Sequence, residues 1–405
     1  MNLNVRPPKS GPMKIGILPQ GGKEWIAGVV YLQNLVRALN LLPEAERPSL
    51  YFILGPGMTV EDHRDLGAHL PPSKHYAFRA GTSLRQKIRE LLRAGRFLRE
   101  PISAERLVRR LKLTALFPVQ GSLGRDFPCS WIGWIPDFQH KRLAQYFSAA
   151  ELRGRDESFQ RIVDEAAHVV VSSQDAYVDL MRWFPIASER ASVFPFVSVP
   201  AEEWYAGDPR PVTEGFGLPK KYLIFPSQFW IHKNHKCAFE AIRILRETSC
   251  PEIALVCTGR TYDYRHPGYA RELLDDLKRH GLERNVYCLG LLGRQAQIQL
   301  VRGAAAVVQP SFFEGWSLLV EDARTLGKKI YVSDIPVHRE QDPPDAEYFS
   351  PESPEELAAL VARDWERLSP GPDRAREQEA FSVQRARAAH FARSFIKIIQ
   401  EAVRS

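Results

Sequence analysis

Three carboxylates surround a glycine and an apolar run in the stretch PSFFEGWSLLVEDARTLG, which spans residues 310–327. Glu314 directly precedes Gly315, and Ser317 is placed to cap a helix that ends before Gly327. The free backbone N–H groups of residues 317–319 can hold phosphate oxygens, while Glu314 accepts hydrogen bonds from hydroxyl groups. A glutamate at this position has little structural reason to be there. The stretch therefore predicts a site for a ligand that carries both phosphates and hydroxyls.

The other two carboxylates, Glu321 and Asp322, are neighbours on the same predicted helix. Consecutive helical residues point about 100° apart, so the two side chains cannot both face one ligand. One of them can lie on a solvated helix face while the other contacts the ligand. The residue types alone leave the choice between them open.

Two cationic residues follow predicted strands. Lys233 stands in PSQFWIHKNH near the start of a helix, where a cation does not complement the helix dipole. An anionic ligand held between this lysine and backbone N–H groups explains it, and the alternative is an ordinary exposed lysine. Arg260 in CTGRTYDYRH can offer a forked guanidinium to a diphosphate, and a surface salt bridge would also explain it.

Two loops of the first half complete the set of candidates. Gly21 and Gly22 in QGGKEWIAG allow close approach of the backbone to a ligand ahead of a helix, although a simple tight turn explains them equally well. Asp137 and His140 in WIPDFQHKRL can reach a cleft and hold sugar hydroxyls. A purely structural histidine is the competing interpretation.

Short apolar runs alternate with amphipathic stretches along the chain, which is typical of doubly wound α/β domains. In the first half we expect strands at residues 13–19, 50–55, 130–134, 168–173 and 192–198, with helices at 29–42 and 174–185. In the second half we expect strands at 222–227, 253–259, 285–292, 305–311 and 329–334. The helices expected there are 234–248, 268–281, 294–304, 317–327, 353–368 and 382–403.

The residues from 200 to 219 are rich in proline, glycine and acids, which predicts a linker or domain entry. We therefore divide the chain into a first Rossmann-like domain (1–199), a second one (200–380) and a C-terminal helix (381–405) that packs back on the first. The predicted fold class is α/β, with two Rossmann-like domains facing a central cleft where ligands bind at the strand C-terminal ends.

The net charge of +7 is concentrated in residues 79–112, which hold eleven Arg or Lys against three Glu. Apolar residues recur there at helical spacing, so a solvated helix, a patch on an anionic membrane surface and a nucleic-acid site are three readings. Phe97 is the only aromatic residue within residues 80–111, and bases need aromatic partners for stacking, so nucleic-acid binding is the weakest of the three.

No apolar run reaches the ~20 residues of a membrane span, and residues 1–20 lack the layout of a signal peptide. The five cysteines show no CxxC pairing, which favours reduced thiols over disulfides or a zinc site. We expect a cytoplasmic protein, peripheral on the inner membrane face if the basic segment binds lipid.

At the candidate residues the sequence resembles the retaining GT-B glycosyltransferases of the glycosyltransferase 4 type. The resemblance is closest over residues 220–341, and SDIPVHREQ and EYFSPESPEELA belong to the same pattern. The first half contributes the paired glycines, PDFQH and VVSSQDAYVDL. This implies a second domain that binds a nucleotide-activated sugar and a first domain that binds the acceptor.

The resemblance also implies roles for individual residues. Glu314, Lys233 and His140 would be catalytic: Glu314 would bond the donor sugar, Lys233 the diphosphate, and His140 is the nearest match to a first-domain histidine. The family's histidine directly precedes its aspartate, where Pro136 stands here. The donor would contact a wider set, comprising Gly21, Gly22, Gln228, Arg260, Leu291, Gly315, Trp316, Ser317, Leu318, Leu319, Asp322 and Glu321.

Two departures from the family pattern affect charge. An arginine five residues before the lysine is replaced by Gln228, so Arg260 or another cation must answer one diphosphate charge. The family's E-x7-E spacing, counted from Glu314, lands on Asp322, and Glu321 is the reserve candidate for the ribose. No cluster of the DxD type follows a predicted strand, so we expect no metal and no cofactor.

The predicted function is transfer of a hexose, with mannose and glucose as first choices, from a UDP- or GDP-linked donor to a glycan or lipid-linked acceptor. We expect the pathway to be cell-envelope or extracellular polysaccharide synthesis, with possible peripheral membrane contact through residues 79–112 and no nucleic acid. Two alternatives stay open: a nucleotide-sugar epimerase of the same fold, and a catalytically degenerate protein that binds glycans or partners.

Overall fold

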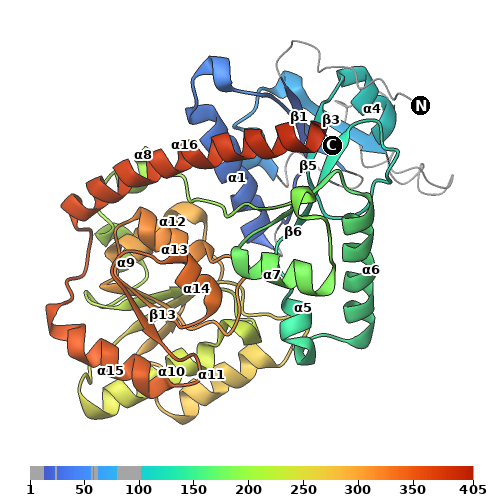
Figure 1. Ribbon diagram of the computed structural model, residues 1–405. Helices are drawn as coiled ribbons and strands as arrows, with labels where there is room; N and C mark the ends of the chain where they lie inside the picture. Colours follow the sequence, from blue (N-terminus) through green and yellow to red (C-terminus); the bar gives the residue numbers. More distant parts are fainter. Residues whose placement is uncertain (1–12, 23–24, 56–57, 59–62, 80–101, 405) are drawn as a thin grey trace, which may run out of the picture.

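The computed structural model describes residues 13–22, 25–55, 58, 63–79 and 102–404, and contains two parallel β-sheets (Figure 1). The first sheet has the order β4-β3-β2-β1-β5-β6-β7-β8. The strands at its centre are buried and apolar because helices cover both faces, as a parallel sheet requires. They are β1 (Lys14–Ile17), β2 (Ser49–Leu54), β3 (His75–Arg79), β4 (Ile102–Ser103), β5 (Ala115–Val119), β6 (Ser130–Ile135), β7 (His168–Val171) and β8 (Ala191–Val193).

The helices of the first half connect these parallel strands. Strands β3, β4 and β5 were not among the expected elements. The sequence there is interrupted by turn residues and prolines, such as Pro118 within β5, which hide the apolar pattern. The helices are α1 (Ile26–Leu41), α2 (Arg64–Gly67), α4 (Ala104–Leu111), α5 (Gln139–Arg142), α6 (Ala149–Glu165) and α7 (Gln174–Trp183).

The second sheet has the order β11-β10-β9-β12-β13-β14, and all its printed pairings are parallel. Its strands are β9 (Leu223–Pro226), β10 (Leu255–Thr258), β11 (Val286–Cys288), β12 (Ala306–Gln309), β13 (Ile330–Ser333) and β14 (Ala346–Phe349). Around it lie α10 (His235–Thr248), α11 (Tyr269–Arg279), α12 (Arg294–Gly303), α13 (Leu318–Thr325), α14 (Pro336–Gln341) and α15 (Pro354–Asp364).

The proline-rich segment from 200 to 219 is more ordered than a linker. It contains two short helices, α8 (Glu202–Tyr205) and α9 (Arg210–Gly215). Trp204 of α8 is buried in the core of the second half, and its carbonyl accepts a hydrogen bond from Gln299 of α12 at 2.9 Å. The buried side chain of Trp204 thus anchors a segment whose composition alone predicted a linker.

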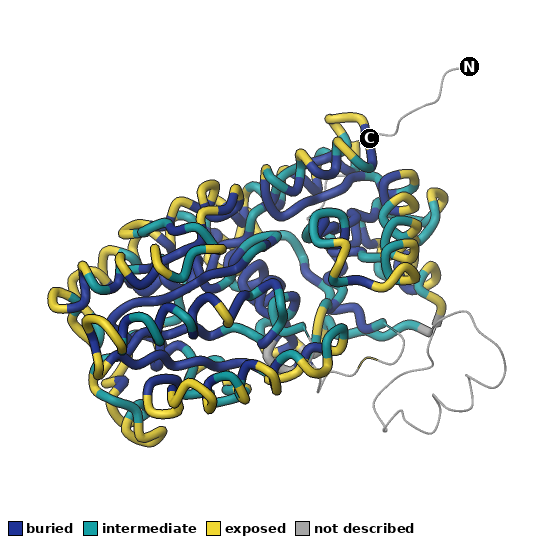
Figure 2. The backbone as a smooth tube through the Cα atoms, turned by 90° about the horizontal axis from the view of Figure 1, so that it is seen from below, coloured by how far each residue is buried: buried dark blue, intermediate teal, exposed yellow. Residues whose placement is uncertain are grey.

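The last helix, α16 (Arg374–Arg404), begins beside the second half and runs back across the first (Figure 1). Its buried face includes Phe391 and Phe395, which pack on Phe194 and Phe117 of the first half. Figure 2 shows buried residues concentrated in the centre of each half, with exposed residues along the outer helices. The chain therefore crosses between the halves twice, once near residue 199 and once through α16.

A carboxylate of the second half caps a helix of the first. The side chain of Glu340 on α14 accepts hydrogen bonds from the backbone N–H of Gln174 at 2.7 Å and of Asp175 at 3.1 Å, at the start of α7. Helix N-termini attract negative charge, so the contact joins the two halves on the side of α14 and α7.

Most of the basic segment 79–112, residues 80–101, lies outside the described residues. What is described of it includes α4, where Arg106, Arg109 and Arg110 are exposed while Leu107 and Val108 are buried. Within the described part of the chain, no helix combines the length and apolar character needed to cross a membrane.

Replacing Phe391 with alanine should lower the free energy of unfolding by about 3–5 kcal/mol, because the ring stacks on Phe194 with centroids 4.4 Å apart inside the core. Urea unfolding followed by circular dichroism measures the change. Val383→Ala on the exposed face of the same helix is the matched control and should change stability by less than about 0.5 kcal/mol. Equal effects of the two substitutions would contradict the packing of α16 on the first sheet.

Candidate active site

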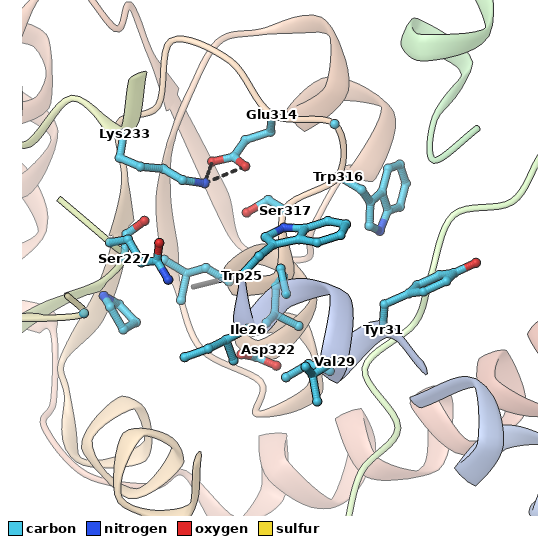
Figure 3. A pocket seen from close by; sticks show the side chains of 18 of the residues that line it. Trp25, Ile26, Val29, Tyr31, Ser227, Lys233, Glu314, Trp316, Ser317 and Asp322 are labelled. Carbon is cyan, nitrogen blue, oxygen red and sulfur yellow. Dashed lines mark hydrogen bonds and ion pairs between the residues drawn. The ribbon is translucent and has the colours of Figure 1, made fainter. Parts of the chain in front are cut away.

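A pocket of about 440 Å³ lies between the two halves, where loops at the carboxyl ends of both sheets meet (Figure 3). Pro136 and Asp137 enter it after β6, Gln228 after β9, and Gly259 after β10. Ligands of open α/β sheets bind at this edge, and here two such edges face each other. The pocket is therefore the candidate active site.

Lys233 and Glu314 form an ion pair inside the pocket. The ammonium Nζ donates to both carboxylate oxygens of Glu314, at 2.7 and 2.8 Å (Figure 3). Gln309 and Ser311 each donate a further hydrogen bond to Glu314 Oε1 at 2.7 Å. The carboxylate is 8% exposed, so these contacts fix its orientation as well as its charge.

A buried histidine supports the loop that carries Glu314. Ser333 donates to the carbonyl of Ser311 at 2.6 Å, and Nδ1 of His338 contacts the carbonyl of Ser333 at 2.9 Å. Burial lowers the pKa of His338 to about 4, although the nearby Glu314 charge opposes the shift. The ring is therefore neutral at neutral pH and acts as an uncharged support.

The N-terminus of α13 points into the pocket beside this pair. Ser317 is its N-cap, as the sequence predicts, and its hydroxyl accepts a hydrogen bond from the Val320 N–H at 3.4 Å. The N–H of Ser317 is itself taken by the side chain of Gln341, at 3.0 Å. The N–H groups of Leu318 and Leu319 have no intrahelical acceptor and are the ones left for an anion.

The two neighbouring acids on α13 have different surroundings. Asp322 lines the pocket, accepts a hydrogen bond from Ser198 at 2.9 Å and is bound by both terminal nitrogens of Arg294. Glu321 is fully buried outside the pocket lining and contacts Arg387 of α16 at 3.1 Å. Neither side chain lies on a solvated helix face, and the one that reaches the pocket is Asp322.

His140 does not reach the pocket, which corrects the role expected for it. Its Nε2 contacts Asp156 at 2.9 Å, and its ring is enclosed by Phe147 and Phe159. Burial lowers its pKa, against the effect of Asp156. The helical turn of α5 directs the ring toward α6, and Asp137, three residues earlier, lines the pocket instead.

Gly315 makes room for this aspartate. A Cβ atom at residue 315 would lie 2.6 Å from the Pro136 carbonyl oxygen and 2.8 Å from Asp137 Cβ. The glycine next to Glu314 therefore allows the two halves to touch, so that the carboxylates of Asp137 and Glu314 share the pocket wall.

Of the remaining sequence candidates, Gln228 and Leu291 line the pocket, as do Trp316, Leu318 and Leu319. Arg260 and the two glycines Gly21 and Gly22 are not among the lining residues. Gly21 has a φ of +78°, and a Cβ there would lie 2.2 Å from the Trp25 carbonyl oxygen. It serves the tight turn that starts α1, which is the structural alternative that the sequence left open.

Residues 212–377 match the family model for glycosyl transferases group 1. This segment therefore belongs to that family. The matched region contains Lys233, Glu314 and Asp322, and the resemblance drawn from the sequence is confirmed. A comparison with curated proteins found no match.

Several solved structures share the fold. HepE of Anabaena, in complex with UDP and glucose, is 16% identical with a TM-score of 0.65, covering 95% of this chain and 98% of that chain. Sucrose-phosphate synthase from Thermosynechococcus elongatus is 14% identical with a TM-score of 0.66, covering 96% and 98%. WaaG, a glycosyltransferase involved in lipopolysaccharide biosynthesis, is 12% identical with a TM-score of 0.58, covering 93% and 95%. The predicted GT-B fold is confirmed.

The glycosyltransferase has an aromatic wall on the first-domain side of its pocket that sequence reasoning missed. Trp25 stacks on Trp134 with ring centroids 5.5 Å apart, and Tyr31 stacks on the same indole at 4.5 Å. All three line the pocket. Trp25 stands three residues after Gly22, and an aromatic residue in a strand-to-helix loop was the available signal.

Arg294 is the second residue that sequence reasoning missed. It lines the pocket of this glycosyltransferase at the first position of α12, directly after Gly293. Nothing in the local pattern separates it from any other basic residue at a helix start, because its partner Asp322 is distant in sequence. Among the described residues, no three His, Cys, Asp or Glu side chains converge as a metal site would need.

Lowering the pH from about 7 to about 5 should destabilise the protein through its buried histidines. Below its usual pKa of 6.5, His338 is protonated in the unfolded chain but stays neutral in the folded protein until about pH 4. The free energy of unfolding therefore falls as the pH falls through this window, by about 2 kcal/mol from this residue down to pH 5, and is constant above it.

The His338→Asn variant should show a loss smaller by that amount in urea unfolding at the two pH values. His390→Asn, on an exposed position of α16, is the control and should keep the wild-type loss. Identical pH dependence of both variants and the wild type would refute a neutral buried His338.

Proposed function

We propose that the protein is a retaining glycosyltransferase that moves a hexose from a nucleoside diphosphate sugar to a hydroxyl of a glycan or lipid-linked acceptor. The observation that carries the proposal is the Lys233–Glu314 pair beside the N-terminus of α13, in a pocket between the two halves. A fixed cation, free N–H groups and an oriented carboxylate are what a diphosphate and a sugar need together.

The order of groups along the pocket supports a donor laid out from sugar to base. Glu314 accepts from the sugar hydroxyls, and the N–H groups of Leu318 and Leu319 hold the diphosphate. Asp322 lies one helical turn beyond Leu318 on α13, about 6 Å at 1.5 Å per residue, where the ribose that follows the diphosphate would lie. Leu291, half exposed at the rim, borders the base.

Lys233 serves both the sugar and the diphosphate. An ammonium group has three N–H donors, and two of them are directed at the oxygens of Glu314. The third stays available for a phosphate oxygen. Gln228 supplies a neutral donor where the family has an arginine, so much of the charge of the departing diphosphate falls on Lys233 and the helix N–H groups.

In the transfer step, the bond between the anomeric carbon and the phosphate oxygen breaks while an acceptor hydroxyl attacks the same face of the sugar. The acceptor proton passes to an oxygen of the departing diphosphate, so no further base is required. The donors around the diphosphate stabilise the charge that develops there. Asp137, which faces the Glu314 loop, is placed to orient a hydroxyl at this centre.

The first domain binds the acceptor beside Trp25, whose partly exposed ring stacks on the buried Trp134, on which the buried Tyr31 also stacks. Aromatic faces with a few polar groups suit the apolar face of a sugar ring. UDP-glucose is the first donor to test because HepE, which shares the fold, was solved with UDP and glucose. An envelope polysaccharide acceptor at the cytoplasmic membrane face is consistent with the exposed arginines of α4 and with the likeness to WaaG.

We further assign the acceptor domain to residues 1–199 and the donor domain to residues 200–380, with 381–405 returning to the first. Calorimetric titration with UDP, GDP and ADP tests the proposed function directly. Binding of one of them with a Kd in the micromolar range is expected. Failure of all three to bind would overturn the proposal.

Glu314→Gln should reduce transfer from UDP-glucose by about 100-fold or more, on the scale of losing one transition-state contact. The same change removes the negative partner of Lys233, so UDP should bind at least as tightly as to the wild type. Release of UDP measures the rate, and calorimetry measures the affinity. A variant with normal turnover would rule out the proposed catalytic site.

Lys233→Met should weaken UDP binding by about 1–3 kcal/mol, or roughly 5- to 150-fold, because a charged hydrogen bond to the diphosphate is lost. Lys236→Met, three residues later and exposed on α10, is the matched control and should leave the affinity unchanged. Uridine, which lacks the phosphates, should bind the Lys233 variant and the wild type equally. A similar loss for uridine would place Lys233 away from the diphosphate.

A further inference from the structure

The carboxylate of Asp322 has fewer free hydrogen-bonding positions than its place in the pocket suggests. Oδ1 accepts from Ser198 at 2.9 Å and from Nη2 of Arg294, while Oδ2 accepts from Nη1 of Arg294 at 2.6 Å. An ionised carboxylate offers about four lone-pair positions, so these contacts leave one. A ribose presents two adjacent hydroxyls, and Asp322 can accept from only one of them.

Arg294 is more open to the pocket than the carboxylate that it binds. Its side chain is 25% exposed, against 3% for Asp322. Two of its five N–H groups are directed at Asp322, which leaves three for a ligand. Its guanidinium lies 5.1 Å from the ring of Trp204, so it is held in place from two sides. The guanidinium of Arg294, a hydrogen-bond donor held in a fixed place, thus lies beside the one free lone-pair position of the Asp322 carboxylate.

We propose that Arg294 is a specificity-determining residue of the donor site, which donates a hydrogen bond to the oxygen of one ribose hydroxyl while Asp322 accepts from the other. The inference rests on the proposed function, because it requires a nucleoside diphosphate with its phosphates at the start of α13. The aspartate at residue 322, one methylene shorter than a glutamate, leaves the space that the guanidinium fills. The Arg294–Asp322 pair therefore recognises one ribose hydroxyl as a hydrogen-bond acceptor and the other as a donor.

The test is calorimetric titration of the full chain with UDP, 2′-deoxy-UDP and 3′-deoxy-UDP. The wild type should bind UDP about tenfold more tightly than either deoxy analogue, the scale of one hydrogen bond to a charged group. Arg294→Met should weaken UDP binding about tenfold and abolish discrimination against one deoxy analogue only. Arg294→Lys, which keeps the charge and a donor, should recover part of the loss.

Arg279→Met is the matched control, because Arg279 also binds a neighbouring aspartate but lies exposed on α11, away from the pocket. It should bind all three nucleotides as the wild type does. Thermal unfolding of every variant checks that the fold is kept, and Arg294→Lys, which leaves no buried charge unpaired, serves if the methionine variant unfolds.

Three outcomes would overturn the inference: a wild type that does not distinguish the deoxy analogues, an Arg294→Met variant that still rejects both, or one that accepts both. The last result would mean that Arg294 only holds Asp322 in place. A wild type that binds none of UDP, GDP and ADP would instead refute the proposed function itself.

Discussion

Three buried carboxylates, Glu314, Glu321 and Asp322, must each be paired, and the rest of the site depends on this requirement. An unpaired charge in such a place would cost several kcal/mol. Each carboxylate finds its partner on a different element: Lys233 after β9, Arg387 on α16, and Arg294 on α12. The pairing therefore ties one loop and one short helix to three distant parts of the chain, and fixes the pocket wall by electrostatics as much as by packing.

The same short helix lies where the chain crosses between the halves. Ser198 of the first crossing bonds Asp322, and Gln384 of α16 bonds both the Ser198 carbonyl and the hydroxyl of Thr325 on α13. The elements that would hold the donor's phosphates and ribose are thus part of the joint between the halves. Occupation of the pocket and the angle between the halves act on the same set of hydrogen bonds.

The sequence was sufficient to predict those elements and caps that depend on residues close together in the chain. Apolar runs located five of the six strands of the second half, with β14 as the exception, and Ser317 with Gly327 marked the ends of α13, because capping depends on neighbours in sequence. The spacing from Glu314 favoured Asp322 over Glu321, and the structure places that side chain in the pocket. These inferences needed only the 3.6-residue period of the helix and the order of the loops.

The failures come from contacts between residues distant in sequence. His140 was expected in the cleft, but Phe159 of α6 and Phe147, which precedes α6, enclose it. Arg294 was not noticed because its partner is 28 residues away. Gly21 was a candidate ligand contact, whereas it accommodates a backbone turn and is not among the residues that line the pocket. The residue types around these positions do not indicate which surface each side chain faces.

The Glu340 carboxylate at the start of α7 has a consequence for the motion of the two halves. A helix of the first half has its dipole completed by a charge from the second, so separating the halves returns two backbone N–H groups and a carboxylate to water. Opening of the cleft would work against an electrostatic restoring force at this contact, in addition to the bonds at the crossings of the chain. Dissolved salt screens this force, which makes ionic strength a determinant of how long a substrate stays enclosed.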